Sequence, residues 1–205
     1  MPTLETSLPF LALWALVGYT LGSIPFGVVF ARIMGLGNLR EIGSGNIGAT
    51  NVLRTGNKTA AALTLVFDAG KGAFAVLLAR LLASEDAAQI TALTAMLGHC
   101  YPIWLRFSGG KGVATFLGLL WALSWPIGLS CCLIWLIAAA ISRMSSFAAL
   151  TSAAMSAPIM LILGQAQGTI LCLLLTVIIF WRHQDNIRRI RNGHEPRIGQ
   201  KSNEM

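Results

Sequence analysis

Long apolar stretches separated by short polar segments make up most of this chain. A helix needs about 20 apolar residues to cross a bilayer, and the stretches 9–31, 59–83, 87–105, 147–163 and 167–181 predict such helices. A further stretch, 113–141, carries no charged side chain and is interrupted by Trp125-Pro126. It predicts either one tilted helix or two shorter helices that meet at the proline.

The distribution of basic residues favours two helices in 113–141. If this stretch is split, the chain crosses seven times, and the segments 32–58, 105–112, 142–146 and the tail from Arg182 share one side. Those segments carry all but two of the 15 Lys and Arg residues. Cytoplasmic loops are enriched in Lys and Arg. The sequence therefore predicts an all-α integral membrane fold: one domain, 1–205, of seven transmembrane helices, with the N-terminus outside and the C-terminus in the cytoplasm.

Composition supports a membrane protein. The chain has 205 residues, of which 55% are hydrophobic and 11% charged, and a soluble domain of this size could not bury so much apolar surface. The net charge of +7 could indicate nucleic acid binding, but basic loops beside anionic headgroups explain it, so no nucleic acid partner is predicted. The four cysteines lie in or beside apolar stretches, and their spacing fits neither a zinc site nor a disulfide framework.

The segment 41–54, EIGSGNIGATNVLR, contains the pattern G-x-G-x-x-G at Gly43, Gly45 and Gly48. A dinucleotide fingerprint needs a strand before it, whereas a transmembrane helix is predicted here, so no cofactor is expected. Glycines still let backbone N–H groups turn toward an anion. We predict a phosphate site in which Thr50 or Asn51 caps a short helix and Arg54 is a bidentate donor. Its candidate residues are Gly43, Ser44, Gly45, Asn46, Thr50, Asn51 and Arg54.

A second glycine cluster lies in the segment 98–115. Gly109-Gly110-Lys111-Gly112 resembles part of a P-loop, but a glycine follows the lysine where Ser or Thr is required. The cluster therefore predicts that Lys111 and the amides of Gly109, Gly110 and Gly112 bind a phosphate at the membrane surface, rather than ATP. His99 lies inside the preceding apolar stretch, and its position favours a hydrogen-bonded packing residue over the alternative, a catalytic group.

Polar residues also follow two later stretches. The turn 142–146 offers the hydroxyls of Ser145 and Ser146, and in the tail His183 and Asn186 are spaced to share one helix face. The basic run 188–191 predicts an anchor at the membrane surface, with Asp185 pairing to one of its arginines.

Asp68 and Lys71 lie inside the apolar stretch 59–83, three residues apart. Charges within a membrane are costly and are paired or functional. The spacing predicts either a structural ion pair or a direct contact with substrate.

Together these segments resemble a bacterial family, the membrane acyltransferases that acylate glycerol 3-phosphate with acyl phosphate. The blocks that carry the resemblance are GSGNIGATNVLR at 43–54, D-x-x-K-G at 68–72, G-H-x-x-P at 98–102, GGKGVAT at 109–115, and H-x-x-N-I-x-R with G-x-E between 183 and 195. The match covers nearly the whole chain. Ser108 and Gln184 depart from it, since the family usually has a basic side chain at each position.

The resemblance implies an enzyme of the bacterial inner membrane with its active site at the cytoplasmic face. The implied reaction converts acyl phosphate and glycerol 3-phosphate into 1-acylglycerol 3-phosphate and inorganic phosphate, the first acylation of phospholipid biosynthesis. An upstream enzyme would form the acyl phosphate, and the acyl tail would enter from the lipid bilayer. No cofactor or metal is implied.

For this reaction we expect direct attack of the glycerol hydroxyl on the activated carbonyl, with positioning and charge stabilisation supplying most of the rate. Lys111 and Arg54 would neutralise the phosphates, and the hydroxyl and amide side chains of Ser44, Asn46, Thr50, Ser145 and Ser146 would orient them. Asn186 would donate to a substrate oxygen, and Glu195 would position a basic neighbour. The proton acceptor is either a substrate phosphate or His183.

Two other classes compete with this interpretation. A transporter of a phosphorylated solute also suits buried charges and anion-binding loops, but the halves of the chain show no internal repeat. A CDP-alcohol phosphotransferase would need a metal-binding series of aspartates, and the chain has only Asp68, Asp86 and Asp185. Their scarcity also argues against a magnesium requirement.

Overall fold

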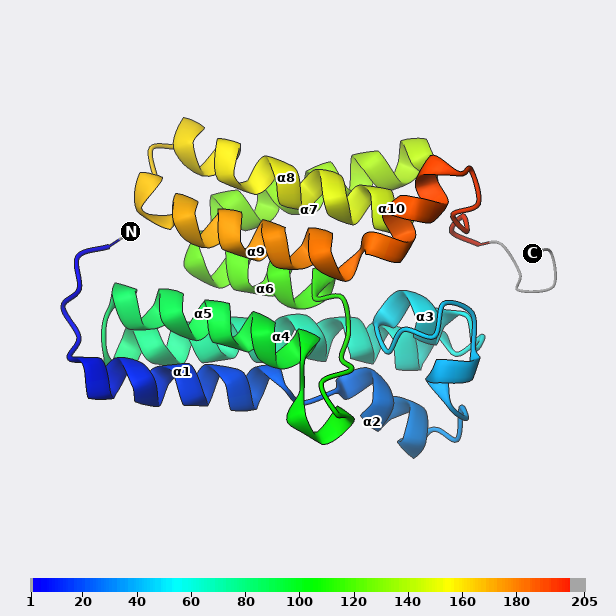
Figure 1. Ribbon diagram of the computed structural model, residues 1–205, viewed down its shortest axis with the longest axis horizontal. Coiled ribbons are helices and arrows are strands. Elements are labelled where there is room, and N and C mark those ends of the chain that lie inside the picture. Colours follow the sequence, from blue (N-terminus) through cyan, green and yellow to red (C-terminus); the bar gives the residue numbers. More distant parts are fainter. Residues whose placement is uncertain (1, 200–205) are drawn as a thin grey trace.

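A computed structural model describes residues 2–199, which form helices and connecting turns without a β-strand in that range. The long helices lie side by side, with α6 between a layer of α7, α8 and α9 and a layer of α1, α4 and α5 (Figure 1). The helices are α1 Leu8–Gly22, α2 Phe26–Ile33, α3 Ala49–Leu53, α4 Lys58–Leu82, α5 Glu85–Cys100, α6 Val113–Leu123, α7 Trp125–Ser142, α8 Ser145–Ile162, α9 Thr169–Arg182 and α10 Gln184–Arg191.

Four helical segments of this part of the chain are long and apolar enough to cross a membrane: Leu8–Ile33, Lys58–Leu82, Trp125–Ser142 and Ser145–Ile162. The pair α9–α10, bent by 64°, is a fifth if it counts as one span. The predicted split of 113–141 is confirmed, because α6 ends at Leu123 and α7 begins at Trp125. Pro126 lies in the first turn of α7, where its missing N–H is not needed.

The first apolar stretch, 9–31, is not one straight helix as its composition predicts. It breaks between α1 and α2 at Ser23-Ile24-Pro25, because proline restricts the residue before it and lacks the N–H that would continue the helix. The carbonyl groups released by the break find side-chain donors. Trp104 Nε1 lies 2.7 Å from the oxygen of Ser23, and Lys71 Nζ lies 2.6 Å from that of Ile24.

Glycines allow the helices to approach closely. Gly18 and Gly22 of α1 face α5, and a Cβ atom built at Gly22 would lie only 2.1 Å from the carbonyl oxygen of Ala95. Gly118 of α6 has the same relation to the oxygen of Ala69 in α4, also at 2.1 Å. Small residues four apart are typical of helix packing in membranes, where no hydrophobic effect drives helices together.

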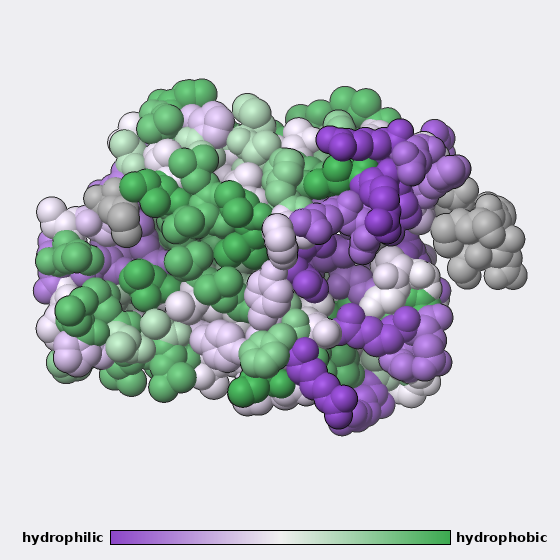
Figure 2. Space-filling view, in the orientation of Figure 1, coloured by the Kyte–Doolittle hydropathy of each residue, from purple (hydrophilic) through white to green (hydrophobic). Residues whose placement is uncertain are grey.

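One end of the molecule is polar, and we call it the polar end: the segments 39–58, 106–112, 143–146 and 182–195. In Figure 2, hydrophilic side chains gather over α2, α3 and α10, while most of the visible surface along the other helices is apolar. Leu16, Val66, Ile137 and Val177 are among the exposed apolar side chains of the long helices. This pattern is expected of a bundle that meets lipid along its sides.

Candidate functional site

The glycine-rich loop at the polar end is organised around Asn51. Its side-chain oxygen accepts hydrogen bonds from the backbone N–H of Ser44 at 3.0 Å and from the Ser44 hydroxyl at 3.2 Å. Its amide nitrogen donates to the carbonyl oxygens of Leu39 and Asn46 at 3.0 and 2.7 Å. Gly43 and Gly45 have φ of +51° and +66°, which only glycine adopts without strain.

The predicted helix cap in this loop is wrong. The helix α3 follows Gly48, so neither Thr50 nor Asn51 is its N-cap. Asn51 lies inside the helix and is 1% exposed. Its side-chain oxygen and nitrogen are both used in hydrogen bonds that hold the loop. Thr50 is exposed, and Asn46 is half-buried.

Arg54 follows α3 and packs against Gly43, where an added Cβ would lie 2.6 Å from Arg54 Cδ. Its Nη1 lies 3.4 Å from the oxygen of Asn51, and within residues 2–199 the guanidinium forms no ion pair. Burial lowers the pKa of Arg54; Glu195 opposes the shift and Arg189 adds to it. Arg54 therefore lies within electrostatic reach of the α10 end of the chain.

The second glycine cluster is clamped between α5 and α9. The N–H groups of Gly109 and Gly110 donate to the carbonyl oxygens of Cys100 and His99, at 3.0 and 3.1 Å. Arg182 donates to the carbonyl oxygens of the same two glycines at 3.0 and 3.1 Å. The prediction that these glycine amides face an anion is therefore corrected. Both N–H groups are already engaged, and the segment offers the ammonium group of Lys111 instead.

Lys111 joins residues from three segments in what we call the Lys111 network: Lys111, Ser146, Asn186, Arg189 and Glu195. Lys111 Nζ donates to Asn186 Oδ1 at 2.5 Å, and Asn186 Nδ2 donates to Glu195 Oε1 at 2.6 Å. The same Glu195 oxygen accepts from the Ser146 hydroxyl at 2.6 Å. Glu195 Oε2 pairs with Arg189 at 2.8 Å, the contact that the predicted positioning of a basic neighbour requires.

The surroundings of Lys111 lower the pKa of its ammonium group. Burial, followed by the nearby Arg189, lowers the pKa of Lys111 to about 8, although Glu195 opposes the shift. Ser145, beside Ser146 at the start of α8, is half-buried.

His183 lies at the bend between α9 and α10, so it does not share one continuous helix with Asn186 as predicted. Its Nδ1 is 2.8 Å from the carbonyl oxygen of Ile179. A carbonyl can only accept, so Nδ1 carries the proton and Nε2 holds the lone pair. Burial lowers the pKa of His183 to about 4, and the ring is therefore neutral at neutral pH.

Two arginines were not singled out in the sequence. Arg40 donates to the carbonyl oxygens of Gly45, at 3.2 Å, and of Ser108, and so links the two glycine loops. Arg182, described above, also stacks over Tyr101, 5.1 Å from its ring centroid. In the sequence, Arg40 and Arg182 cannot be told from the other arginines that orient the chain by their excess in cytoplasmic loops. Only their partners reveal the role.

The remaining predicted pairs are present. Asp68 and Lys71 form a buried ion pair of 2.7 Å, and His99 Nδ1 is hydrogen-bonded to Lys71 Nζ at 2.9 Å. Asp185 pairs with Arg188 at 2.9 Å on the exposed face of α10. Three of the four cysteines are buried.

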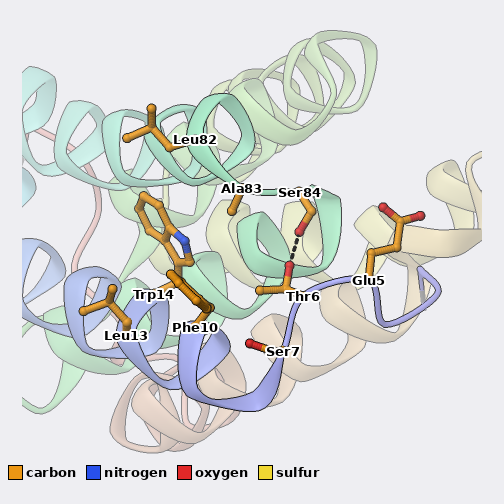
Figure 3. Close-up of a pocket in the computed structure, with 9 residues that line it drawn as sticks. All are labelled: Glu5, Thr6, Ser7, Phe10, Leu13, Trp14, Leu82, Ala83 and Ser84. Atoms are coloured by element: carbon orange, nitrogen blue, oxygen red, sulfur yellow. Dashed lines mark hydrogen bonds between the residues drawn. The ribbon is translucent and has the colours of Figure 1, made fainter.

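A cavity of about 440 Å³ lies at the opposite end of the molecule, between the N-terminal segment and the α4–α5 turn. Figure 3 shows its lining, in which Trp14 faces Leu82 and the hydroxyl of Thr6 is hydrogen-bonded to that of Ser84. Asp86 fixes this segment by accepting from the backbone N–H groups of Glu5 and Thr6, both at 2.9 Å. None of the predicted site residues lines this cavity.

Comparison with known proteins agrees with this geometry. Residues 12–193 match the family described as glycerol-3-phosphate acyltransferase. The chain is 62% identical to proteins of that name from Roseobacter denitrificans, over 97% of this chain and 99% of the relative, and Cereibacter sphaeroides, over 100% and 97%.

Two solved structures share the fold. Crystal structures of PlsY (YgiH), an integral membrane glycerol 3-phosphate acyltransferase, superpose with TM-scores of 0.87 for the glycerol 3-phosphate form and 0.84 for the lysophosphatidic acid form. They are 35% and 33% identical, each over 92% of this chain and over 96% and 95% of theirs.

Proposed function

Since this chain belongs to the glycerol-3-phosphate acyltransferase family and is an acyltransferase, we propose that it transfers a fatty acyl group from acyl phosphate to glycerol 3-phosphate. The products would be 1-acylglycerol 3-phosphate and inorganic phosphate. The observation that supports this most is the Lys111 network, in which one half-buried ammonium is linked through Asn186 and Glu195 to α8 and the tail. Arg54 lies within electrostatic reach of the same carboxylate, so two cations serve two phosphorylated substrates.

In the proposed mechanism the glycerol hydroxyl attacks the carbonyl of the mixed anhydride directly, and phosphate leaves. Lys111 and Arg54 neutralise phosphate oxygens, and the charge that develops on the reacting carbonyl is stabilised by fixed donors. Ser44, Asn46 and Thr50, which belong to the same loop as Arg54, would orient the phosphate bound there, and Ser145 would do so beside the Lys111 network. Asn51 and the glycines at 43, 45, 109, 110 and 112 hold the loops in shape.

We place this site at the cytoplasmic face of a bacterial inner membrane, in a seven-span topology with the N-terminus outside. Support comes from α5, α6 and α9, which are shorter than the other spans but run alongside them (Figure 1), and from the basic residues at the polar end. Lys201, one of the basic residues that the sequence predicts on the cytoplasmic side, lies outside the described residues. An upstream enzyme would supply the acyl phosphate.

The decisive assay uses purified protein in detergent with acyl phosphate and glycerol 3-phosphate. We expect release of inorganic phosphate that requires both substrates and matches the lysophosphatidic acid formed. Phosphate release without glycerol 3-phosphate would contradict the proposal. Solute flux in liposomes without any phosphate release would indicate a transporter instead.

His183→Ala tests the proton acceptor. If Nε2 takes the proton from the glycerol hydroxyl, kcat should fall by about 10²–10⁴-fold, the usual contribution of general acid–base catalysis. The measurement is kcat at saturating acyl phosphate, with His194→Ala as the control because His194 is exposed. A fall of only a few-fold would leave the substrate phosphate as the base.

Asn51→Asp tests the organisation of the glycine loop. The aspartate keeps an acceptor for Ser44 but loses both donors, so a carboxylate oxygen would face the carbonyl oxygens of Leu39 and Asn46. An unsatisfied buried polar group costs about 1–3 kcal/mol and a charged one more. We expect a lower melting temperature. We also expect a raised KM for the substrate whose phosphate binds at this loop. Asn38→Asp, at an exposed position on the same loop, should change neither by much.

A further inference from the structure

Three buried ionisable side chains, Asp68, Lys71 and His99, lie beneath the second glycine cluster and have no part in the mechanism above. They are 2%, 7% and 5% exposed. We infer that they form a positioning device that sets the place of Lys111 through the contact of His99 with Gly110. This inference rests on the role proposed for Lys111.

Lys71 is the centre of the device. Its Nζ lies 2.7 Å from Asp68 Oδ1, 2.6 Å from the carbonyl oxygen of Ile24 and 2.9 Å from His99 Nδ1. An ammonium has three N–H donors and no acceptor, so all three donors are used and His99 Nδ1 is the acceptor. The proton of His99 is therefore on Nε2. One side chain of α4 thus ties together the break between α1 and α2 and the end of α5.

The far edge of the His99 ring meets Gly110. A Cβ atom built on Gly110 would lie 2.2 Å from His99 Nε2 and 2.9 Å from Cε1, so the ring leaves no room for a methyl group. The N–H of Gly110 donates to the backbone oxygen of His99, and its own carbonyl accepts from Arg182. The residue directly before Lys111 is therefore held by a ring whose orientation Lys71 sets.

A purely stabilising role explains this arrangement less well. Buried ion pairs contribute little net stability compared with apolar side chains of similar volume, because both charges lose their water. Charges inside a membrane bundle are costly as well. Positioning accounts for the cost, since a displacement of about 1 Å in a group that orients substrate can lower the rate about a hundredfold.

The test is a pair of substitutions that clash alone and fit together. Gly110→Ala places a methyl group against His99 Nε2, and we expect kcat/KM to fall about a hundredfold. His99→Asn keeps an acceptor for Lys71, because Asn Oδ1 replaces Nδ1, but removes Nε2 and Cε1, the two ring atoms nearest to the methyl group. The double variant should therefore recover at least about tenfold over Gly110→Ala, the coupling expected of residues in contact.

Gly109→Ala is the matched control. Its methyl group would lie 2.2 and 2.6 Å from the backbone oxygens of His99 and Cys100, and no side-chain truncation can relieve that clash. Combining it with His99→Asn should bring no recovery. Recovery in both pairs, recovery in neither, or full activity of Gly110→Ala alone would overturn the inference.

Each variant is assayed for kcat and KM separately, and its melting temperature is recorded. If Gly110→Ala does not fold, His99→Asn alone carries the test: kcat/KM should fall about tenfold with a nearly unchanged melting temperature, because Lys71 keeps its acceptor. Unchanged kcat/KM in that variant would overturn the inference. Wild-type protein that releases no phosphate from acyl phosphate would instead refute the proposed function.

Discussion

Lys111→Met should lower kcat/KM about 10³-fold. Methionine keeps most of the length of the side chain but removes the charge that would face a substrate phosphate, and one preorganised donor is worth about 10²–10³ in rate. The buried Asn186 oxygen also loses its donor. The measurement is initial phosphate release over a range of both substrates.

Lys58→Met is the control, because Lys58 is an exposed lysine within the polar end and has no contact with the Lys111 network among the hydrogen bonds described above. We expect it to change kcat/KM by less than about twofold, as for surface substitutions away from a site. A similar loss in both variants would mean that Lys111 acts only through the general positive potential of the surface.

The pH profile gives an independent test of the same residue. The pKa of Lys111 is lowered to about 8, so the side chain is charged below that pH and neutral above it. We expect kcat/KM, which reports the free enzyme, to fall as pH rises through about 8. Lys111→Arg should move this alkaline limb to higher pH, because guanidinium keeps its proton. An unmoved limb would assign it to another group.

Glu195→Gln should lower kcat/KM about a hundredfold. Gln keeps the oxygen that accepts from Ser146 and Asn186, but its amide nitrogen would face the Arg189 guanidinium, which then loses its carboxylate partner. Removing one partner of a fully buried charge pair costs about 3–5 kcal/mol, and the cost here should be smaller because the Arg189 side chain is 34% exposed. Part of that loss would appear as a lower melting temperature and part as misplacement of Asn186 and Lys111.

This variant also has a signature that a structural defect would not produce. Glu195 raises the pKa of Lys111, so its removal should shift the alkaline limb to lower pH. Glu41→Gln is the matched control, since Glu41 is an exposed carboxylate of the polar end that accepts from Asn38. Retained activity with an unmoved limb in Glu195→Gln would contradict the network.

Much of the fold follows from local sequence. Hydropathy places most spans, and Pro126 marks the boundary of α6 and α7, because lipid tolerates only stretches that satisfy their own backbone groups. The spacing of Asp68 and Lys71 also indicates their ion pair, since residues three apart meet on a helix surface. The break at Pro25 was not predicted. It depends on Lys71 and Trp104, which lie in distant segments and donate hydrogen bonds to the carbonyl groups that the break releases.

The sequence by itself determined the class of protein, the polar end and the side chains available there, because hydropathy, charge and glycine spacing are properties of neighbouring residues. Only the tertiary structure decided what each group does. Lys111 and Asn186 are 75 positions apart, and Ser146 and Glu195 are 49 apart. The amides of Gly109 and Gly110 were engaged by α5 rather than left for an anion. Such pairings depend on how the helices pack, and no local pattern records which distant donor satisfies which buried acceptor.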